Sequence, residues 1–226
     1  DASILDVRNN YFYASVGYPG GQELMFGSGN MREDPKGAID VHGGCGDREH
    51  CAVVQHNCVV GYQTGVHIVG EAGNSLDDNG VGVTESRNYF LVRWNSIRRA
   101  VAAITLWSAA NYNLTGVLIE GNDVTVEPTL HSDGWAYSHW GIGMSDNGSN
   151  EHCGDFNDIT IRHNTIDFPL GANQTNAAPI ISAPLYYAGM SLMPCKRAEN
   201  LRIENNTVAN APIMALNLGR SNELDH

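Results

Sequence analysis

Short alternations of apolar and polar residues recur along the chain, and one type of alternation always leads to an asparagine. Two apolar residues are separated by one residue of any type. After two further residues comes an asparagine, and two positions after it another apolar residue; this pattern occurs six times. Its asparagines are Asn10, Asn57, Asn95, Asn122, Asn164 and Asn206. Because an apolar period of two is typical of strands that bury one face, each copy predicts short strands around a turn.

A second alternation lies between successive copies of the first. A small residue, an apolar residue, any residue and another apolar residue follow one another, starting at Ala38, Gly65, Ala103, Gly141, Gly189 and Ala215. The asparagines of the first pattern are 47, 38, 27, 42 and 42 residues apart. A fixed local pattern with variable spacing indicates a solenoid whose coils carry insertions, whereas helical repeats keep a stricter period.

The asparagines suggest how such coils stack. Asparagine tolerates the left-handed conformation that a sharp turn needs, and stacked side-chain amides can hydrogen-bond along the axis. In these features the sequence, from Ser3 to Leu218, resembles the right-handed parallel β-helices of the pectate-lyase-like superfamily, whose coils carry an asparagine ladder. We therefore expect an all-β fold, a right-handed parallel β-helix solenoid of about six coils with loop insertions, in a single domain over residues 1–226.

The ends of this solenoid lack recognisable caps. Solenoids need polar caps at both ends, and no amphipathic helix precedes the first copy of the repeat or follows the last. We therefore expect the chain to be a fragment or processed piece, or a subunit that associates end to end with another copy.

Composition narrows the class of partner. The 226 residues include 13 basic and 25 acidic side chains, which give a formal net charge of −12. This balance argues against nucleic acid, because phosphate binding needs clustered basic side chains. The apolar runs are far shorter than the roughly 18 residues of a membrane span, so we expect none. The chain offers few candidates for the lysine base that some lyases use, because the only lysines are Lys36 and Lys196.

The insertions predict a groove. Extra segments at about 13–36, 125–140 and 167–188 lengthen coils one, four and five at one corner, and coils two and three lack them. Loops on one side of a solenoid commonly carry its binding surface. Alternation places Asp40, His42, His67, Thr105 and Trp107 on the floor of this groove. The candidate wall of coil four adds Trp135, Tyr137, His139 and Trp140.

Aromatic side chains with a few convergent polar groups suit a saccharide, because sugar C–H faces pack on rings while hydroxyls take hydrogen bonds. A polysaccharide is therefore the expected partner, with Trp107, Trp135, Tyr137, His139 and Trp140 as candidate binding residues. The alternative is that Trp107 and Trp140 only cover the rod beneath the loops.

Asp40, His42 and His67 form the best catalytic constellation. Asp40 and His42 share one face of a strand, stacking brings His67 within about 5 Å of Asp40, and a histidine beside a carboxylate can act as a general base. The segment from Ala38 to His42 resembles the Gly-Phe/Ile-Asp-Pro-His segment of mannuronan C5-epimerases, although Gly37 replaces that family's tyrosine and Val41 its proline.

The resemblance to the epimerases implies removal of the C5 proton of a uronate, in an epimerase or a lyase. Arg98 and Arg99, in the turn before the third strand of coil three, would neutralise the substrate carboxylate. The alternative is an exposed polar strand without catalytic function. A net charge of −12 weighs against a polyuronate unless the arginine pair or Ca²⁺ offsets it locally.

The sequence evidence for a metal site is weaker than that for the catalytic residues. Asp77, Asp78 and Glu85 could bind Ca²⁺, although such acidic loops are usually only solvated. His50, Cys51, His56 and Cys58 cluster in the sequence but lack the spacing of a zinc motif.

The cysteines predict an oxidising compartment. Cys153 and Cys195 each lie 11 residues before a ladder asparagine, so that they share a register in adjacent coils and could form a disulfide. Cys45 and Cys51 could form another, which leaves Cys58 over. Two pairs favour a secreted or cell-surface protein over a cytosolic one with reduced cysteines. Glycosylation acceptor sequences at Asn113, Asn147, Asn173 and Asn205 are compatible with secretion.

Two functions of different classes remain open at this point. The first is a secreted carbohydrate-active protein, most concretely a lyase or epimerase acting on an acidic polysaccharide. The second is a non-catalytic surface protein, an adhesin segment or a filament-forming subunit, which the missing caps favour.

Overall fold

The structure is a computed structural model of the 226-residue chain. It describes residues 5–13, 37–42, 52–62, 64–70, 89–100, 102–108, 114–126, 139–145, 156–169, 187–192, 198–211 and 214–218. Within these segments the chain forms strands and turns and no helix, so that none is long and apolar enough to cross a membrane.

The strands form three parallel sheets. The first contains β1 (Asp6–Arg8), β4 (Ala52–Gln55), β7 (Phe90–Arg93), β10 (Leu114–Glu120), β13 (Phe156–Arg162), β16 (Ala198–Glu199) and β17 (Arg202–Glu204). The second contains β2 (Tyr11–Tyr13), β5 (Cys58–Val60), β8 (Ser96–Ala100), β11 (Asp123–Val126), β14 (Thr165–Asp167) and β18 (Thr207–Ala209). The third contains β3 (Gly37–His42), β6 (Thr64–Gly70), β9 (Ala102–Ser108), β12 (His139–Ser145), β15 (Tyr187–Leu192) and β19 (Met214–Leu218).

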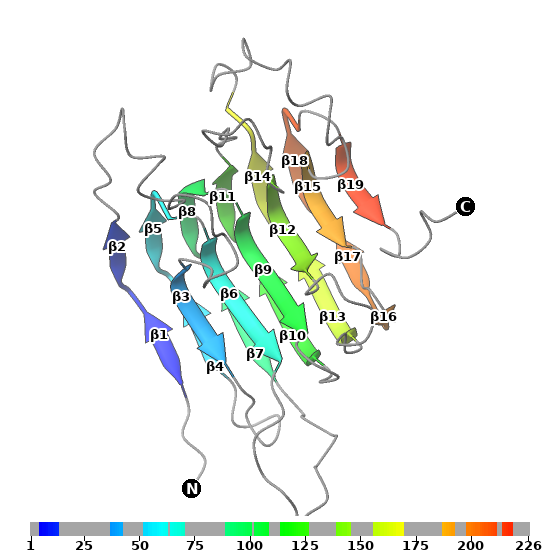
Figure 1. Ribbon diagram of the computed structural model, residues 1–226, viewed down its shortest axis with the longest axis horizontal. Helices are drawn as coiled ribbons and strands as arrows, with labels where there is room; N and C mark the ends of the chain where they lie inside the picture. The colour runs from blue at the N-terminus through cyan, green and yellow to red at the C-terminus, as the bar shows by residue number, and fades with distance from the viewer. Residues whose placement is uncertain are drawn as a thin grey trace, which may run out of the picture.

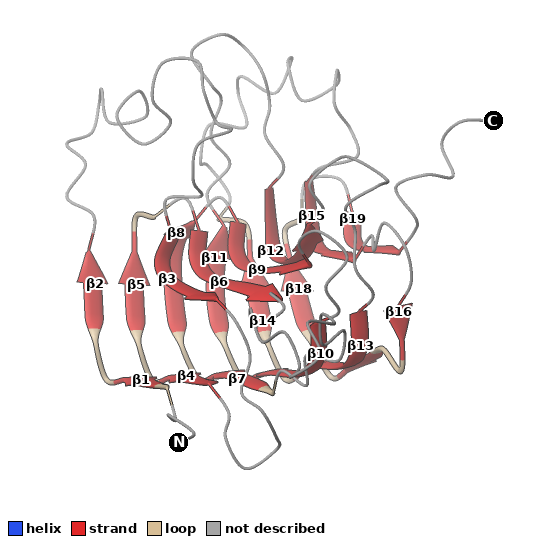
Figure 2. Ribbon diagram, turned by 60° about the horizontal axis from the view of Figure 1, so that its bottom comes forward, coloured by secondary structure: helices blue, strands red, loops and turns tan. Residues whose placement is uncertain are grey.

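Successive strands enter the three sheets in turn, and each new turn of the chain adds a parallel strand to every sheet. This topology is a parallel β-helix of six coils, as the repeat predicts (Figure 1). Viewed after rotation, the three sheets surround one apolar interior, with coil one at β1 and coil six at β19 (Figure 2).

The insertions fall at the predicted corner. The connection from the second sheet to the third spans residues 14–36, 127–138 and 168–186 in coils one, four and five. It spans only residues 61–63 in coil two and residue 101 in coil three. The walls that we expect these insertions to form lie outside the described residues, apart from residues 168–169.

The core is a set of columns, because the register places equivalent side chains on top of one another. Val66, Ile104, Ile142 and Met190 form one such column across β6, β9, β12 and β15. All four are buried within the core. Burying an aliphatic side chain of this size stabilises the fold by about 1.5–3 kcal/mol, so each column supports several coils at once.

The small residue of the second repeat has a steric cause. A Cβ added to Gly65 would lie 2.6 Å from Cγ2 of Ile97, and one added to Gly141 would lie 2.4 Å from Cγ2 of Ile166. The third-sheet strand therefore begins where its backbone packs against a core side chain of the second sheet. This close approach explains why glycine occupies the position in coils two, four and five.

The asparagine ladder runs along the corner between the first and second sheets. Asn95 Nδ2 donates to Asn122 Oδ1 at 3.0 Å and to the carbonyl oxygen of Val54 at 2.9 Å. In turn, Asn95 Oδ1 accepts hydrogen bonds from the backbone nitrogen and from Nδ2 of Asn57, both at 3.0 Å. Side-chain amide bonds of the same kind link all six ladder asparagines. Each interior amide is thereby satisfied although it is almost completely buried.

The left-handed residue of this corner is the one before the ladder asparagine, not the asparagine itself. Positive φ angles of 53–64° occur at Asn9, His56, Trp94, Gly121, His163 and Asn205. The left-handed residue turns the chain, and the buried amide that follows it ties the turn to its neighbours.

We predict that Asn122→Ala lowers the free energy of unfolding by about 3–5 kcal/mol, because it leaves several buried donors and acceptors without partners at about 1–3 kcal/mol each. The matched control is Asn10→Ala, which removes an exposed end of the ladder and should cost about 1 kcal/mol. Urea denaturation followed by circular dichroism measures both values. Equal losses for the two variants would contradict a stabilising role for the interior ladder.

Candidate functional site

A row of polar and small residues crosses the outer face of the third sheet. The register pairs Asp40 with His67, His67 with Thr105, Thr105 with Gly143, and Gly143 with Ser191. The residues on either side of each row member point into the core, as Val66 and Ile68 do beside His67. The row therefore lies on the face away from the core, where the alternation of the sequence places Asp40, His67 and Thr105.

Asp40 and His67 form a hydrogen-bonded pair, with 3.0 Å between Asp40 Oδ1 and His67 Nδ1. An ionised carboxylate can only accept, so the proton of this bond belongs to Nδ1. In the neutral imidazole the second nitrogen, Nε2, then carries the basic lone pair. The pair thus has the chemistry of a histidine general base oriented by a carboxylate.

The two members of the pair differ in exposure. The His67 side chain is 5% exposed, whereas the Asp40 side chain is 37% exposed. The imidazole is therefore held in a protected position, and the carboxylate faces the solvent side of the sheet.

Trp107 covers the imidazole. Its indole lies against the ring of His67 with 5.7 Å between the centroids and 19° between the planes. Trp107 comes two residues after Thr105 on β9, and it retains partial exposure. The residue that we predict as a sugar-stacking group is thus in direct contact with the predicted base.

Trp140 closes the other side of Thr105. Its Nε1 donates to Thr105 Oγ1 at 3.1 Å. A Cβ at Gly143 would lie only 2.5–2.6 Å from three atoms of the same indole, so the ring lies across the backbone of Gly143. One continuous group that spans coils one to four is therefore formed by Asp40, His67, Thr105 and the two indoles.

Gly143 and Ser191 are residues of this row that the sequence argument did not assign to the site, whereas it placed Thr105 on the floor of the groove. Their signal was present in the same alternation, which places them on the outer face. The hydrogen bond from Trp140 could not be expected, because Trp140 is on β12 of coil four and reaches Thr105 on β9 of coil three only through the register of the third sheet.

Other predicted residues lie elsewhere or outside the described residues. Arg98 is on β8 of the second sheet, where its guanidinium contacts Asp123 and donates to Thr125 Oγ1 at 2.7 Å. Arg99 follows it with φ of 58° at the corner that leads to the third sheet. The structure therefore does not bring Arg98 onto the face that carries Asp40 and His67.

His42 and His139 are in described strands, but their side chains are not described. The remaining predicted residues of the site, the metal loop and the disulfides lie outside the described residues: Trp135, Tyr137, Asp77, Asp78, Glu85, Cys45, Cys51, Cys153 and Cys195. Cys58, which the pairing scheme leaves over, is a free cysteine on β5. In the described part of the chain, no three histidine, cysteine or acidic residues are grouped to hold a metal ion.

Comparison of the chain with protein-family models, with curated protein sequences and with solved structures finds no significant match.

We predict that Thr105→Val lowers the free energy of unfolding by about 1–3 kcal/mol, because it leaves the half-buried Nε1 of Trp140 without its acceptor while it keeps the shape of the side chain. Thr105→Ser keeps the oxygen and loses one methyl group, which should cost about 0.8 kcal/mol. Urea denaturation followed by tryptophan fluorescence compares the two variants. A smaller loss for valine than for serine would show that the hydrogen bond does not hold Trp140.

Proposed function

We propose that the chain is a polysaccharide-active β-helix protein of the pectate-lyase-like type that removes the C5 proton of a uronate residue, as a lyase or a C5-epimerase. The observation that carries this proposal is the hydrogen bond between Asp40 and His67, next to Trp107, on the outer face of the third sheet. A carboxylate, an oriented imidazole and an aromatic surface are the parts that such a reaction requires.

In the proposed step, His67 Nε2 takes the proton from C5 of the uronate. The electron pair of the C–H bond moves into the adjacent carboxylate, which becomes an enolate. Asp40 holds Nδ1 protonated and stabilises the imidazolium that forms. Expulsion of the oxygen at C4 then gives elimination, and return of a proton from the opposite face gives the C5 epimer. His42, two residues after Asp40 on the same strand, is the candidate for a second proton-transfer group.

The acidic character of the protein sets a requirement on this proposal. A net charge of −12 repels a polyuronate, so the substrate carboxylate needs a local positive charge. Arg99, at the corner that leads to the third sheet, is one candidate for this charge. Ca²⁺ bound to Asp77, Asp78 and Glu85 is the second candidate, and a secreted protein with disulfides would meet Ca²⁺ in its surroundings.

We predict that Asp40→Asn lowers the rate of C5 proton abstraction by roughly 10²- to 10⁴-fold, the usual contribution of a general base held in the correct tautomer. Exchange of the C5 hydrogen of polymannuronate and polygalacturonate in deuterated water, followed by NMR, measures this step for a lyase and an epimerase alike. Asp123→Asn is the matched control, since it removes the same charge from the second sheet and should leave the exchange unchanged.

Equal exchange rates for the Asp40 variant and the native chain would contradict the proposal. Absence of exchange on both polymers with the native chain would also contradict it. His67→Gln separates the two groups further, because it should abolish exchange more completely than the loss of the orienting carboxylate.

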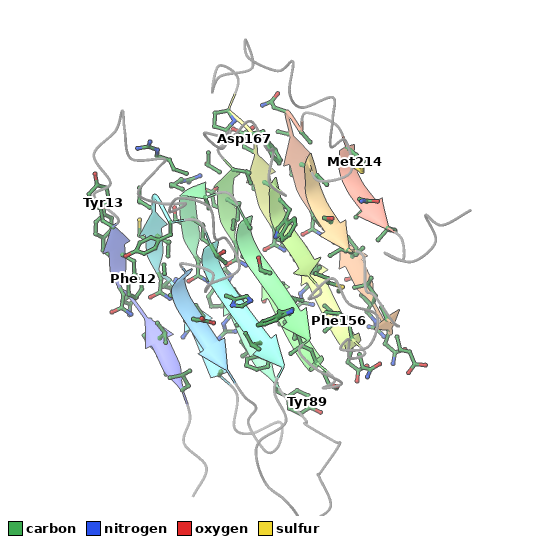
Figure 3. All side chains as sticks on the ribbon, in the orientation of Figure 1. Phe12, Tyr13, Tyr89, Phe156, Asp167 and Met214 are labelled. Atoms are coloured by element: carbon green, nitrogen blue, oxygen red, sulfur yellow. The ribbon has the colours of Figure 1, made fainter. Side chains whose placement is uncertain are left out.

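A specific observation favours end-to-end association as a second function. On β19, Leu216 and Leu218 continue the inward columns of Met190 and Leu192, yet they are 39% and 58% exposed. Figure 3 labels Met214 at the start of this strand and Phe12 on β2 at the opposite end of the rod. Leu216 and Leu218 therefore offer exposed apolar side chains on β19 that a second copy could cover.

The ladder has a polarity that fits such stacking. Among the described residues, no donor reaches Oδ1 of Asn10, and the backbone nitrogen of Asn206 reaches no acceptor. Coil six of one copy thus offers donors where coil one of a second copy offers an acceptor. We propose that, if the chain assembles, coil six of one copy stacks on coil one of the next.

We predict that the native chain associates increasingly with concentration in sedimentation velocity experiments, and that the double variant Leu216→Asp and Leu218→Asp stays monomeric. Trp94→Asp is the control, because Trp94 is a similarly exposed side chain, at 44%, on the lateral surface of coil three. A native chain that remains monomeric at millimolar concentration would exclude this function.

A further inference from the structure

The corner between the first and second sheets carries an aromatic row in addition to the ladder. The left-handed position before the ladder residue is Asn9, Gly121 or Asn205 in coils one, four and six. In coils two, three and five it is His56, Trp94 and His163, with φ of 54–55°. Backbone hydrogen bonds between neighbouring corners, such as His56 N to Arg93 O, keep these positions in register.

The tryptophan at this corner is unfavourable for the backbone of coil three. Asparagine, glycine and histidine adopt the left-handed conformation more readily, whereas a bulky residue such as tryptophan is rare there and strained. Strain of this kind persists mainly where a side chain serves binding or catalysis. Coils one, four and six show that the fold accepts asparagine or glycine at the same position, so folding does not require the tryptophan of coil three.

The side chains form an exposed group centred on Trp94, which is 44% exposed. The ring of His56 lies 5.0 Å from the indole, centroid to centroid, and is tilted by 31°. The guanidinium carbon of Arg93 lies 4.3 Å from the centroid of the indole. Arg93 Nε donates to Gln55 Oε1 at 2.9 Å. In the described part of the chain its other guanidinium N–H groups make no hydrogen bond, so they remain free for a ligand.

Gly121 accommodates this arrangement. A Cβ at this position would lie 2.5 Å from Cδ1 and 2.9 Å from Nε1 of Trp94. The indole therefore extends from coil three over the backbone of coil four, and the aromatic surface spans coils two to four. Asp40 and His67 lie on the outer face of the third sheet, so this corner is a separate surface of the rod.

We propose that His56, Arg93 and Trp94 form a glycan-binding platform, separate from the proposed catalytic face. A pyranose ring would pack its C–H face on the indole, and its hydroxyl or carboxylate oxygens would accept hydrogen bonds from Arg93 and the imidazole of His56. Stacking of a nucleic-acid base on the same indole is disfavoured, because the net charge of −12 opposes a phosphate backbone.

The test replaces Trp94 by asparagine. Trp94→Asn removes the platform and installs a residue that the left-handed corner prefers, so the melting temperature should not fall, while glycan binding should weaken by roughly tenfold or more. Affinity electrophoresis in gels that contain polymannuronate or a soluble neutral β-glucan measures binding. The measurement is made with Trp107→Ala in every sample, so that retention reports the corner whether or not the third sheet binds sugar.

Tyr13→Asn is the matched control, because Tyr13 is an aromatic residue with 55% exposure on β2, the strand of coil one at the end of the second sheet. Retention that falls for the Trp94 variant alone, with an unchanged melting temperature, supports the platform. Equal retention of the two variants, or no retention of the parent on either polymer, overturns it. A fall in the melting temperature without loss of binding assigns Trp94 a structural role and also overturns it. Retention of single-stranded DNA that depends on Trp94 overturns the choice of ligand.

Discussion

The buried amide ladder is the constraint on which the remaining structure depends. A buried side-chain amide must find partners for two donors and two acceptor sites, and here it finds most of them in the coils directly before and after it. Asn95, for example, is satisfied by Asn57, Asn122 and Val54 together. A shift of one coil by a single residue would leave these groups unpaired in the core, so the ladder fixes the register of all three sheets.

The candidate site follows from that register. Asp40 and His67 are 27 residues apart in the chain, and the connections between equivalent strands differ in length from coil to coil. They meet because β3 and β6 are aligned so that Asp40 is opposite His67. The same alignment continues to Thr105 and Gly143, where the absent side chain of the glycine leaves room for Trp140. Loop lengths can therefore vary freely while the polar row stays in place.

The sequence predicts the features that repeat, and it is less informative about those that occur once. Six copies of two patterns were sufficient to assign the coils, the ladder and the outward position of Asp40, His67 and Trp107. The partner of Arg98 was not predictable, because Asp123 lies on the next coil of the second sheet and becomes adjacent only through the register. The sequence argument assigned the left-handed conformation to the ladder asparagine, whereas the residue before it adopts this conformation and turns the chain. Both asparagine and its predecessor are plausible in a turn, and only the burial of the amide distinguishes them.

Departures from the repeat carry the functional information in a fold of this kind. Every position of a coil has six equivalents, so the residue that best serves stability can be identified by its recurrence, as asparagine can in the ladder. A coil that replaces a favourable residue by a strained one, as coil three does with Trp94, gains nothing in folding from the exchange. In the same way, the positions of Asp40 and His67 are occupied in other coils by Gly143 and Ser191. The fold therefore does not require an aspartate or a histidine there. The two groups of departures lie on different surfaces, which is why we propose two separate contacts with ligands rather than one.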